Sequence, residues 1–154
     1  MAEMPTWTLT YHARPMSLNV ERAGNRFQRA PLVKEWRDAY RWLAAEEAIP
    51  PLQWIHVEAR PQYRTARSLP DTAACVGSVK AAIDGLVDAG VLPDDGPELV
   101  RRVTFHAPEV DRSLHSDRLV LTIYGPVAAV EAERARRFKS VLGTHELLPP
   151  GSNP

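Results

Sequence analysis

One stretch in the middle of this 154-residue chain decides the fold: Lys80-Ala-Ala-Ile-Asp84-Gly-Leu-Val-Asp-Ala-Gly-Val-Leu-Pro-Asp94-Asp95. Positions 76, 79, 83, 86 and 87 are apolar, which is the period of a helix with one buried face. Gly90 is the expected C-cap, and Pro93 prevents the helix from continuing. The sequence therefore predicts a helix that ends in a tight turn carrying two adjacent carboxylates.

A further acid, Asp71, follows Pro70 and lies nine residues before Lys80. Carboxylates that converge from two loops beside a lysine are typical of a phosphodiesterase site with a divalent metal ion. Mg²⁺ prefers oxygen ligands and usually takes one or two carboxylates while keeping several waters. A second interpretation is structural: Asp-Asp before Gly-Pro is common in turns, and Lys80 with Asp84 forms an ordinary surface pair at helical spacing.

The stretch resembles the RusA family of Holliday-junction resolvases, small phage-borne endonucleases. The resemblance is carried by Lys80, Asp84-Gly85-Leu86, Ala89-Gly90-Val91 and Asp94-Asp95, in the family's order and spacing. Weaker similarity extends over about residues 7 to 124. It includes Pro15-Met16-Ser17-Leu18-Asn19, similar to the family's Pro-Pro-Ser-x-Asn loop, and the segment from Arg101 to Ile123, similar to its closing strands.

The first half of the family's motif differs here. Asp71-Thr72-Ala73-Ala74 stands where Asp-x-Asp-Asn is expected, with about three extra residues before Lys80. The resemblance therefore implies a metal site of three acids, Asp71, Asp94 and Asp95, or a site that also uses Asp84. In this interpretation Asp71, Lys80, Asp94 and Asp95 are the catalytic residues, and Mg²⁺ is the cofactor.

The resemblance implies a homodimer that cuts four-way junction DNA during recombination or repair. Arginine side chains match phosphate oxygens, so Arg60, Arg64 and Arg67 in an expected basic loop over residues 60–70, together with Asn19, are candidate DNA contacts. Solvated loop charges are the alternative. Two other functions remain open: a junction- or branched-DNA-binding protein with weak or lost cleavage, motivated by Ala73 and Ala74, and an interaction protein in which Asp94-Asp95 is only a turn.

The expected fold is a single α+β domain, a mixed sheet with helices packed on it. Strands are predicted over 7–12, 54–59, 99–105 and 118–124, the last two as an antiparallel pair joined by 107–117. Helices are predicted from near Pro31 to about residue 48, around Lys80, and over 127–142. The buried stripe of the first helix is Leu32, Trp36, Ala39, Tyr40 and Leu43. The domain is expected to span 1–146, with a disordered tail over 147–154.

Composition is that of a globular protein, with 44% apolar and 25% charged residues. The net charge is zero, with an acidic middle between basic ends, which suits a metal site between phosphate-binding surfaces. Cys75 is the single cysteine, so a cysteine zinc cluster is excluded. Without a secretory signal or a membrane-length apolar run, the expected location is the cytoplasm, the host cytoplasm if a phage encodes the protein.

Overall fold

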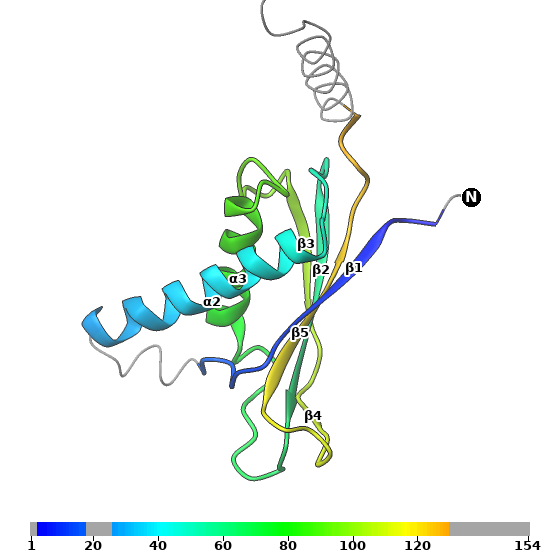
Figure 1. Ribbon diagram of the computed structural model, residues 1–154. Helices are drawn as coiled ribbons and strands as arrows, with labels where there is room; N and C mark the ends of the chain where they lie inside the picture. Colours follow the sequence, from blue (N-terminus) through cyan, green and yellow to red (C-terminus); the bar gives the residue numbers. More distant parts are fainter. Residues whose placement is uncertain (1–2, 18–25, 130–154) are drawn as a thin grey trace, which may run out of the picture.

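Residues 3–17 and 26–129 are described by a computed structural model of the protein. They form β1 (Thr6–Tyr11), α2 (Arg26–Glu46), β2 (Ile55–Tyr63), α3 (Val76–Asp88), β3 (Val100–Phe105), β4 (Glu109–Val110) and β5 (Arg118–Tyr124). The strands make one mixed sheet, and both described helices lie on the same side of it (Figure 1). The expected α+β architecture, a mixed sheet with helices packed on it, is confirmed.

β2 occupies the centre of the sheet, whose strand order is β1-β5-β2-β3 with β4 also paired to β2. β5 is antiparallel to β2, with Val57 opposite Ile123, whereas β3 is parallel to β2, with Val57 opposite Val103. The predicted antiparallel pairing of 99–105 with 118–124 is therefore wrong. β2 lies between these strands, and α3 forms the crossover that a parallel β2–β3 pair requires.

β2 is longer than predicted and continues to Tyr63, so Arg60 belongs to a strand and the basic loop begins only at Arg64. Pro61 does not end the strand, because its backbone nitrogen points toward the edge where β3 ends and β4 begins, and no hydrogen bond is needed there. His106 N–H donates to Ala59 O and Asp111 N–H to Tyr63 O, both at 2.9 Å. Pro61 falls between these two bonds, where the pairing changes from β3 to β4, and its missing N–H leaves a gap that the sheet tolerates.

α2 packs on the sheet through the four-residue repeat Trp36, Tyr40 and Ala44, all at most 2% exposed. The Tyr40 hydroxyl donates to Leu119 O at 2.7 Å, which satisfies it inside the core. Leu32, predicted to be buried, is 36% exposed. α2 begins at Arg26, earlier than predicted, with Pro31 inside it, and its N-terminal turns project beyond the sheet (Figure 1), so Leu32 has less of the core to contact.

α3 lies against α2 at a glycine. A Cβ atom on Gly85 would lie 2.3 Å from the backbone oxygen of Arg37, closer than any real Cβ contact. The Asp84-Gly85-Leu86 part of the motif thus has a packing role: Gly85 lets the two backbones touch, and Leu86 is fully buried beside it. The contact fixes the direction in which the rest of α3 presents its polar side chains.

Burial alternates strictly along β2. Ile55, Val57 and Ala59 face the helices and are fully buried, which is the period of a strand with one core face. The opposite side chains are polar and half-buried: His56, Glu58, Arg60 and Gln62. We call this side of the sheet, which neither described helix covers, the polar face (Figure 1).

Several predictions fall outside the described residues. The loop residue Asn19, nearly all of the helix expected over 127–142, the boundary at residue 146 and the tail over 147–154 belong to this group. Within residues 3–17 and 26–129, neither helix has the length and apolar character needed to cross a membrane.

Candidate functional site

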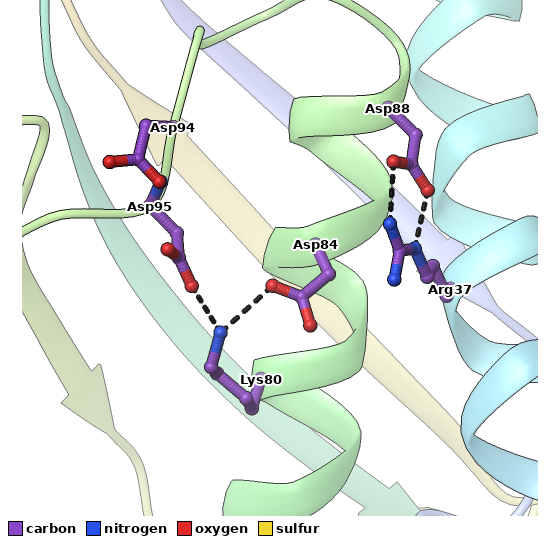
Figure 2. A network of polar contacts seen from close by, with 6 residues as sticks. All are labelled: Arg37, Lys80, Asp84, Asp88, Asp94 and Asp95. Atoms are coloured by element: carbon purple, nitrogen blue, oxygen red, sulfur yellow. Dashed lines mark hydrogen bonds and ion pairs between the residues drawn. The ribbon is translucent and has the colours of Figure 1, made fainter. Parts of the chain in front are cut away.

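The structure brings three residues of the motif into direct contact. The Lys80 ammonium donates to Asp84 Oδ1 at 2.8 Å and also contacts Asp95 Oδ2 (Figure 2). Lys80 and Asp84 are one helical turn apart on α3, whereas Asp95 reaches them from the following loop. We call Lys80, Asp84, Asp94 and Asp95 the Lys80 site.

The loop that carries the two aspartates is held in place by the end of α3. The C-cap is Ala89, and Gly90, predicted for that position, follows it with a positive φ of 81°, a conformation that favours glycine. Val91 N–H returns to Leu86 O at 3.0 Å, and Val91 O accepts from Leu52 N–H at 2.8 Å. The chain therefore leaves the helix along a fixed path, and residues 94 and 95 are positioned beside α3 by backbone bonds.

Asp94 and Asp95 play different parts in this turn. Asp94 Oδ1 accepts the backbone N–H of the next residue, Asp95, at 2.7 Å, a local bond within the turn. Asp95 instead directs its side chain toward Lys80 (Figure 2). The turn explanation of Asp-Asp therefore accounts for one oxygen of Asp94, and it does not account for the contact between Asp95 and α3.

The charges of the Lys80 site reinforce one another. Lys80 donates hydrogen bonds to Asp84 and Asp95, and these bonds raise the pKa of Lys80, so its ammonium is charged at neutral pH. The same ammonium lowers the pKa of Asp95. The Lys80 side chain is 59% exposed and that of Asp95 35%, so both remain accessible to a ligand from solvent.

A second ion pair stands one turn further along α3. Arg37 of α2 donates from Nε and Nη2 to the two carboxylate oxygens of Asp88, at 2.5 and 2.8 Å (Figure 2). This bidentate pair joins the two helices close to Gly85. It links α2 to the helix that carries Lys80.

Asp71, the predicted third metal ligand, is not part of this contact network. It is exposed, ahead of the first turn of α3, and its backbone oxygen accepts from Ala74 N–H at 2.9 Å. Within the described part of the chain, its carboxylate makes no hydrogen bond or ion pair with the Lys80 site. No group of three or more His, Cys, Asp or Glu side chains arranged to hold a metal ion occurs among residues 3–17 and 26–129.

The Lys80 site nevertheless has donors that suit Mg²⁺. Asp94 and Asp95 are consecutive residues with solvent-accessible carboxylates, and Mg²⁺ commonly binds to one or two carboxylates and completes its shell with water. The ammonium of Lys80 is the competing cation, because it already contacts Asp95. The donors therefore fit an ion held by Asp94 and Asp95, with Asp84 as Lys80's remaining partner.

The arginines predicted to contact DNA differ in whether an acidic side chain already compensates their charge. Arg60 lies on the polar face, where Nη2 is 3.1 Å from Glu58 Oε2, so its charge is partly compensated. Arg64 and Arg67 are exposed in the loop after β2. Arg64 N–H donates to Asp117 Oδ1 at 2.9 Å, which anchors the start of that loop through the backbone and leaves the Arg64 guanidinium available.

Sequence reasoning missed a basic and aromatic cluster on the polar face: Trp54, His56, Arg101 and Arg102, which we call the tryptophan cluster. The Arg101 guanidinium lies over the Trp54 ring at 4.7 Å from its centroid, and the Trp54 and His56 rings are 4.9 Å apart. A register shift between Ile55 and His56 creates it. The signal in the sequence was the Arg-Arg pair, which was interpreted only as part of a strand.

Neither the models of known protein families nor the curated proteins searched match this chain. The resemblance to the RusA family therefore rests on the residues from Lys80 to Asp95.

Proposed function

We propose that this protein is a Mg²⁺-dependent endodeoxyribonuclease that resolves Holliday junctions in DNA recombination and repair. One observation carries the proposal. Lys80 and Asp95 are fifteen residues apart, yet their side chains touch, with Asp84 bound to the same ammonium. These are three of the residues by which the sequence resembles the RusA family. A turn and a surface pair formed independently of each other would not require this contact.

Each residue of the Lys80 site has a role in this proposal. Asp94 and Asp95 would hold Mg²⁺, with Asp71 as a further ligand if its loop approaches. When bound, Mg²⁺ supplies a Lewis acid for the phosphoryl oxygen and lowers the pKa of a bound water. Lys80, kept charged by its carboxylates, would neutralise the scissile phosphate. Asp84 would position Lys80, because it holds the ammonium from within the same helix.

The proposal extends to the assembly and location of the protein. Two-fold cleavage of a four-way junction calls for two active sites related by symmetry, so we propose a homodimer in which each subunit supplies one. We also propose a cytoplasmic location, in the host cytoplasm if a phage encodes the chain, because a phage or bacterial DNA junction would be met there.

A second candidate function is a junction- or branched-DNA-binding protein with weak or lost cleavage. Two observations favour it: Ala73 and Ala74 stand where the family has an acid and an amide, and Asp71 makes no contact with the other acids in the described structure. Such a protein would use the same arginines but would not hydrolyse the phosphodiester bond.

A gel assay on a synthetic four-way junction, with and without Mg²⁺, tests these alternatives. We expect symmetric cleavage of the junction only with Mg²⁺, and none of a linear duplex of the same sequence. Junction binding without cleavage at any Mg²⁺ concentration would establish the second candidate. If neither binding nor cleavage occurs, both functions are excluded, and Asp94-Asp95 is a structural turn.

A further inference from the structure

The tryptophan cluster carries two arginines whose charges nothing in the described structure compensates. Arg101 and Arg102 are both exposed, and neither forms an ion pair within residues 3–17 and 26–129. The nearest acid along the polar face of β2 is Glu58, which already lies 3.1 Å from Arg60 and 3.4 Å from His106. The cluster is therefore a surface of net positive charge in a segment that is acidic overall.

The cluster arises from a local irregularity of the sheet. Ile55 pairs with Val100 and His56 with Arg102, so β3 places one extra residue, Arg101, between these pairs. Such a bulge puts two consecutive side chains near the same face of a sheet, where a regular strand would separate them. Arg101 thereby reaches Trp54, while Arg102 stands opposite His56.

Arg101 is already held in a binding orientation. Its planar guanidinium rests on the Trp54 ring, and its Nε donates to Glu98 O at 3.1 Å. The described residues offer no partner to its two Nη atoms. The backbone that carries Trp54 packs closely against Gly125, where a Cβ would lie only 2.2 Å from the Trp54 backbone oxygen. An arginine fixed in this way loses little conformational entropy when its free fork binds an anion.

His56 shows the effect of this charge. Partial burial, then Arg102 and Arg101, lower the pKa of His56. Tyr124 of β5 is its neighbour on the other side and adds no charge at neutral pH. The imidazole is therefore neutral at pH 7 and presents an N–H group beside two guanidinium groups. It also reports on the site, because a bound anion would oppose the arginines.

We propose that Trp54, His56, Arg101 and Arg102 form a binding site for the phosphodiester backbone of a nucleic-acid strand. The choice of ligand rests on the proposed function, which this inference deepens by locating a backbone contact. Arg101 is six residues after Asp95, so the two are separated by at most about 20 Å of chain. That is about six base steps of B-form DNA. The Lys80 site lies on the helix side of the sheet and the tryptophan cluster on the polar face, so a strand that contacts both would pass around the edge formed by β3.

The test measures binding of a fluorescently labelled single-stranded oligonucleotide to the full chain, without Mg²⁺, at several salt concentrations. The double variant R101A/R102A should bind at least about tenfold more weakly. Its log–log salt slope should be shallower by about 1.4 units, roughly 0.7 for each lost phosphate contact. R101K keeps the charge but loses the planar fork, so its affinity for the oligonucleotide should lie between those of the wild type and R101A/R102A. The matched control is R41A, an exposed arginine of α2 on the opposite side of the sheet.

NMR titration of the His56 ring provides a readout that does not depend on cleavage. In the wild type, the oligonucleotide should raise the pKa of His56, because phosphate opposes Arg101 and Arg102. In R101A/R102A the pKa should be higher from the start, and the oligonucleotide should shift it less. Retained near-ultraviolet circular dichroism would show that the variant is folded.

Two outcomes would overturn the inference: a salt slope in R101A/R102A equal to that of the wild type, or binding of polyglutamate with no binding of the oligonucleotide, which would indicate an acidic protein partner. These results also separate the tryptophan-cluster inference from the proposed nuclease function. If the protein cleaves junctions but R101A/R102A has an unchanged salt slope, only the tryptophan-cluster site is excluded. Arginine-dependent oligonucleotide binding without junction cleavage removes only the nuclease.

Discussion

Gly85 and Arg37 meet backbone to backbone: a Cβ atom added to Gly85 would lie 2.3 Å from the Arg37 carbonyl oxygen and 2.9 Å from the Arg41 amide nitrogen. The obstacle is main chain, which cannot rotate away as a side chain would. α2 and α3 can approach this closely only if residue 85 is glycine. The Lys80 site depends on this contact, since Asp84 precedes Gly85 in the same turn of α3.

Gly85→Ala should therefore destabilise the protein. Alanine favours a helix over glycine by up to about 1 kcal/mol, but separating two packed helices costs more, typically about 1–3 kcal/mol for overpacking. We expect a lower free energy of unfolding in urea at neutral pH. Gly96→Ala is the control, because its new Cβ would have its nearest contact at 3.4 Å. Equal stability of the two variants would show that the helices move apart at no cost.

Asp95→Asn should separate DNA binding from cleavage. The substitution keeps the shape and removes a negative charge that faces phosphate, so junction affinity should persist or increase. Cleavage should fall by more than about 100-fold, because losing a group that merely supports a metal ligand already costs about 10–100-fold. Asp38→Asn, in an exposed ion pair with Lys34 on α2, is the control. Parallel loss of affinity and cleavage would assign Asp95 to folding.

Arg64→Ala with Arg67→Ala should weaken junction binding and make its salt dependence shallower, by about one unit of log–log slope per lost contact. The structure makes this a clean test for Arg64. The bond to Asp117 comes from the Arg64 backbone N–H, so alanine preserves it and the loop stays anchored. Binding measured over a range of salt concentrations with an unchanged slope would return both arginines to the role of solvated loop charges.

Asp88→Asn should change the acid side of the stability profile. Hydrogen bonds from Arg37 lower the pKa of Asp88 below its ordinary value of 3.8. A carboxyl with a depressed folded-state pKa contributes stability that is fully present above its unfolded value and is lost as the pH falls through the folded one. The wild type should thus be more stable than Asp88→Asn at neutral pH, and the difference should shrink below about pH 4. A difference that is independent of pH would contradict the ion-pair explanation.

Ala73→Asp tests the altered half of the motif. Ala73 is exposed, so an acid is tolerated there, whereas Ala74 is only 8% exposed and resists a larger polar residue. If residue 73 faces the metal, the new carboxylate should shift the cleavage curve to lower Mg²⁺ concentration. If it crowds Asp71, like charges should weaken the site instead. An unchanged or right-shifted curve means that the alignment before Lys80 must be redrawn.

Local patterns in the sequence predicted the elements well and their partners poorly. The helix around Lys80 and its end before Pro93 are confirmed because both depend on neighbours along the chain. The C-cap is Ala89 rather than the predicted Gly90, which follows it with a positive φ. The pairing of β3 with β5 was wrong because successive strands favour a hairpin, whereas β3 joins β2 in parallel across α3. The end of β2 was missed because Pro61 looks like a break until the two bonds around it are known.

In the Lys80 site too, contacts between residues close in sequence were predictable, and contacts between distant residues were not. Helical spacing alone brings Lys80 to Asp84, and the contact with Asp95 needed the path of the loop, which backbone bonds to Leu86 and Leu52 set. No local rule places Asp71. The tryptophan cluster could not be predicted, because a one-residue shift between β2 and β3 decides which face of the sheet Arg101 occupies. Short sequence patterns do not determine the register between strands that are far apart in the chain.

The pairing of β1 has a consequence for folding during synthesis of the chain. β1 pairs with β5, from Thr6 opposite Tyr124 to Tyr11 opposite Leu119, and has no other strand partner in the described structure. Of the described strands, β1 is therefore synthesised first and pairs only when the last of them, β5, has been made. A nascent chain stalled before residue 118 would hold β1 as a bare edge, open to pairing with neighbouring chains on the same message.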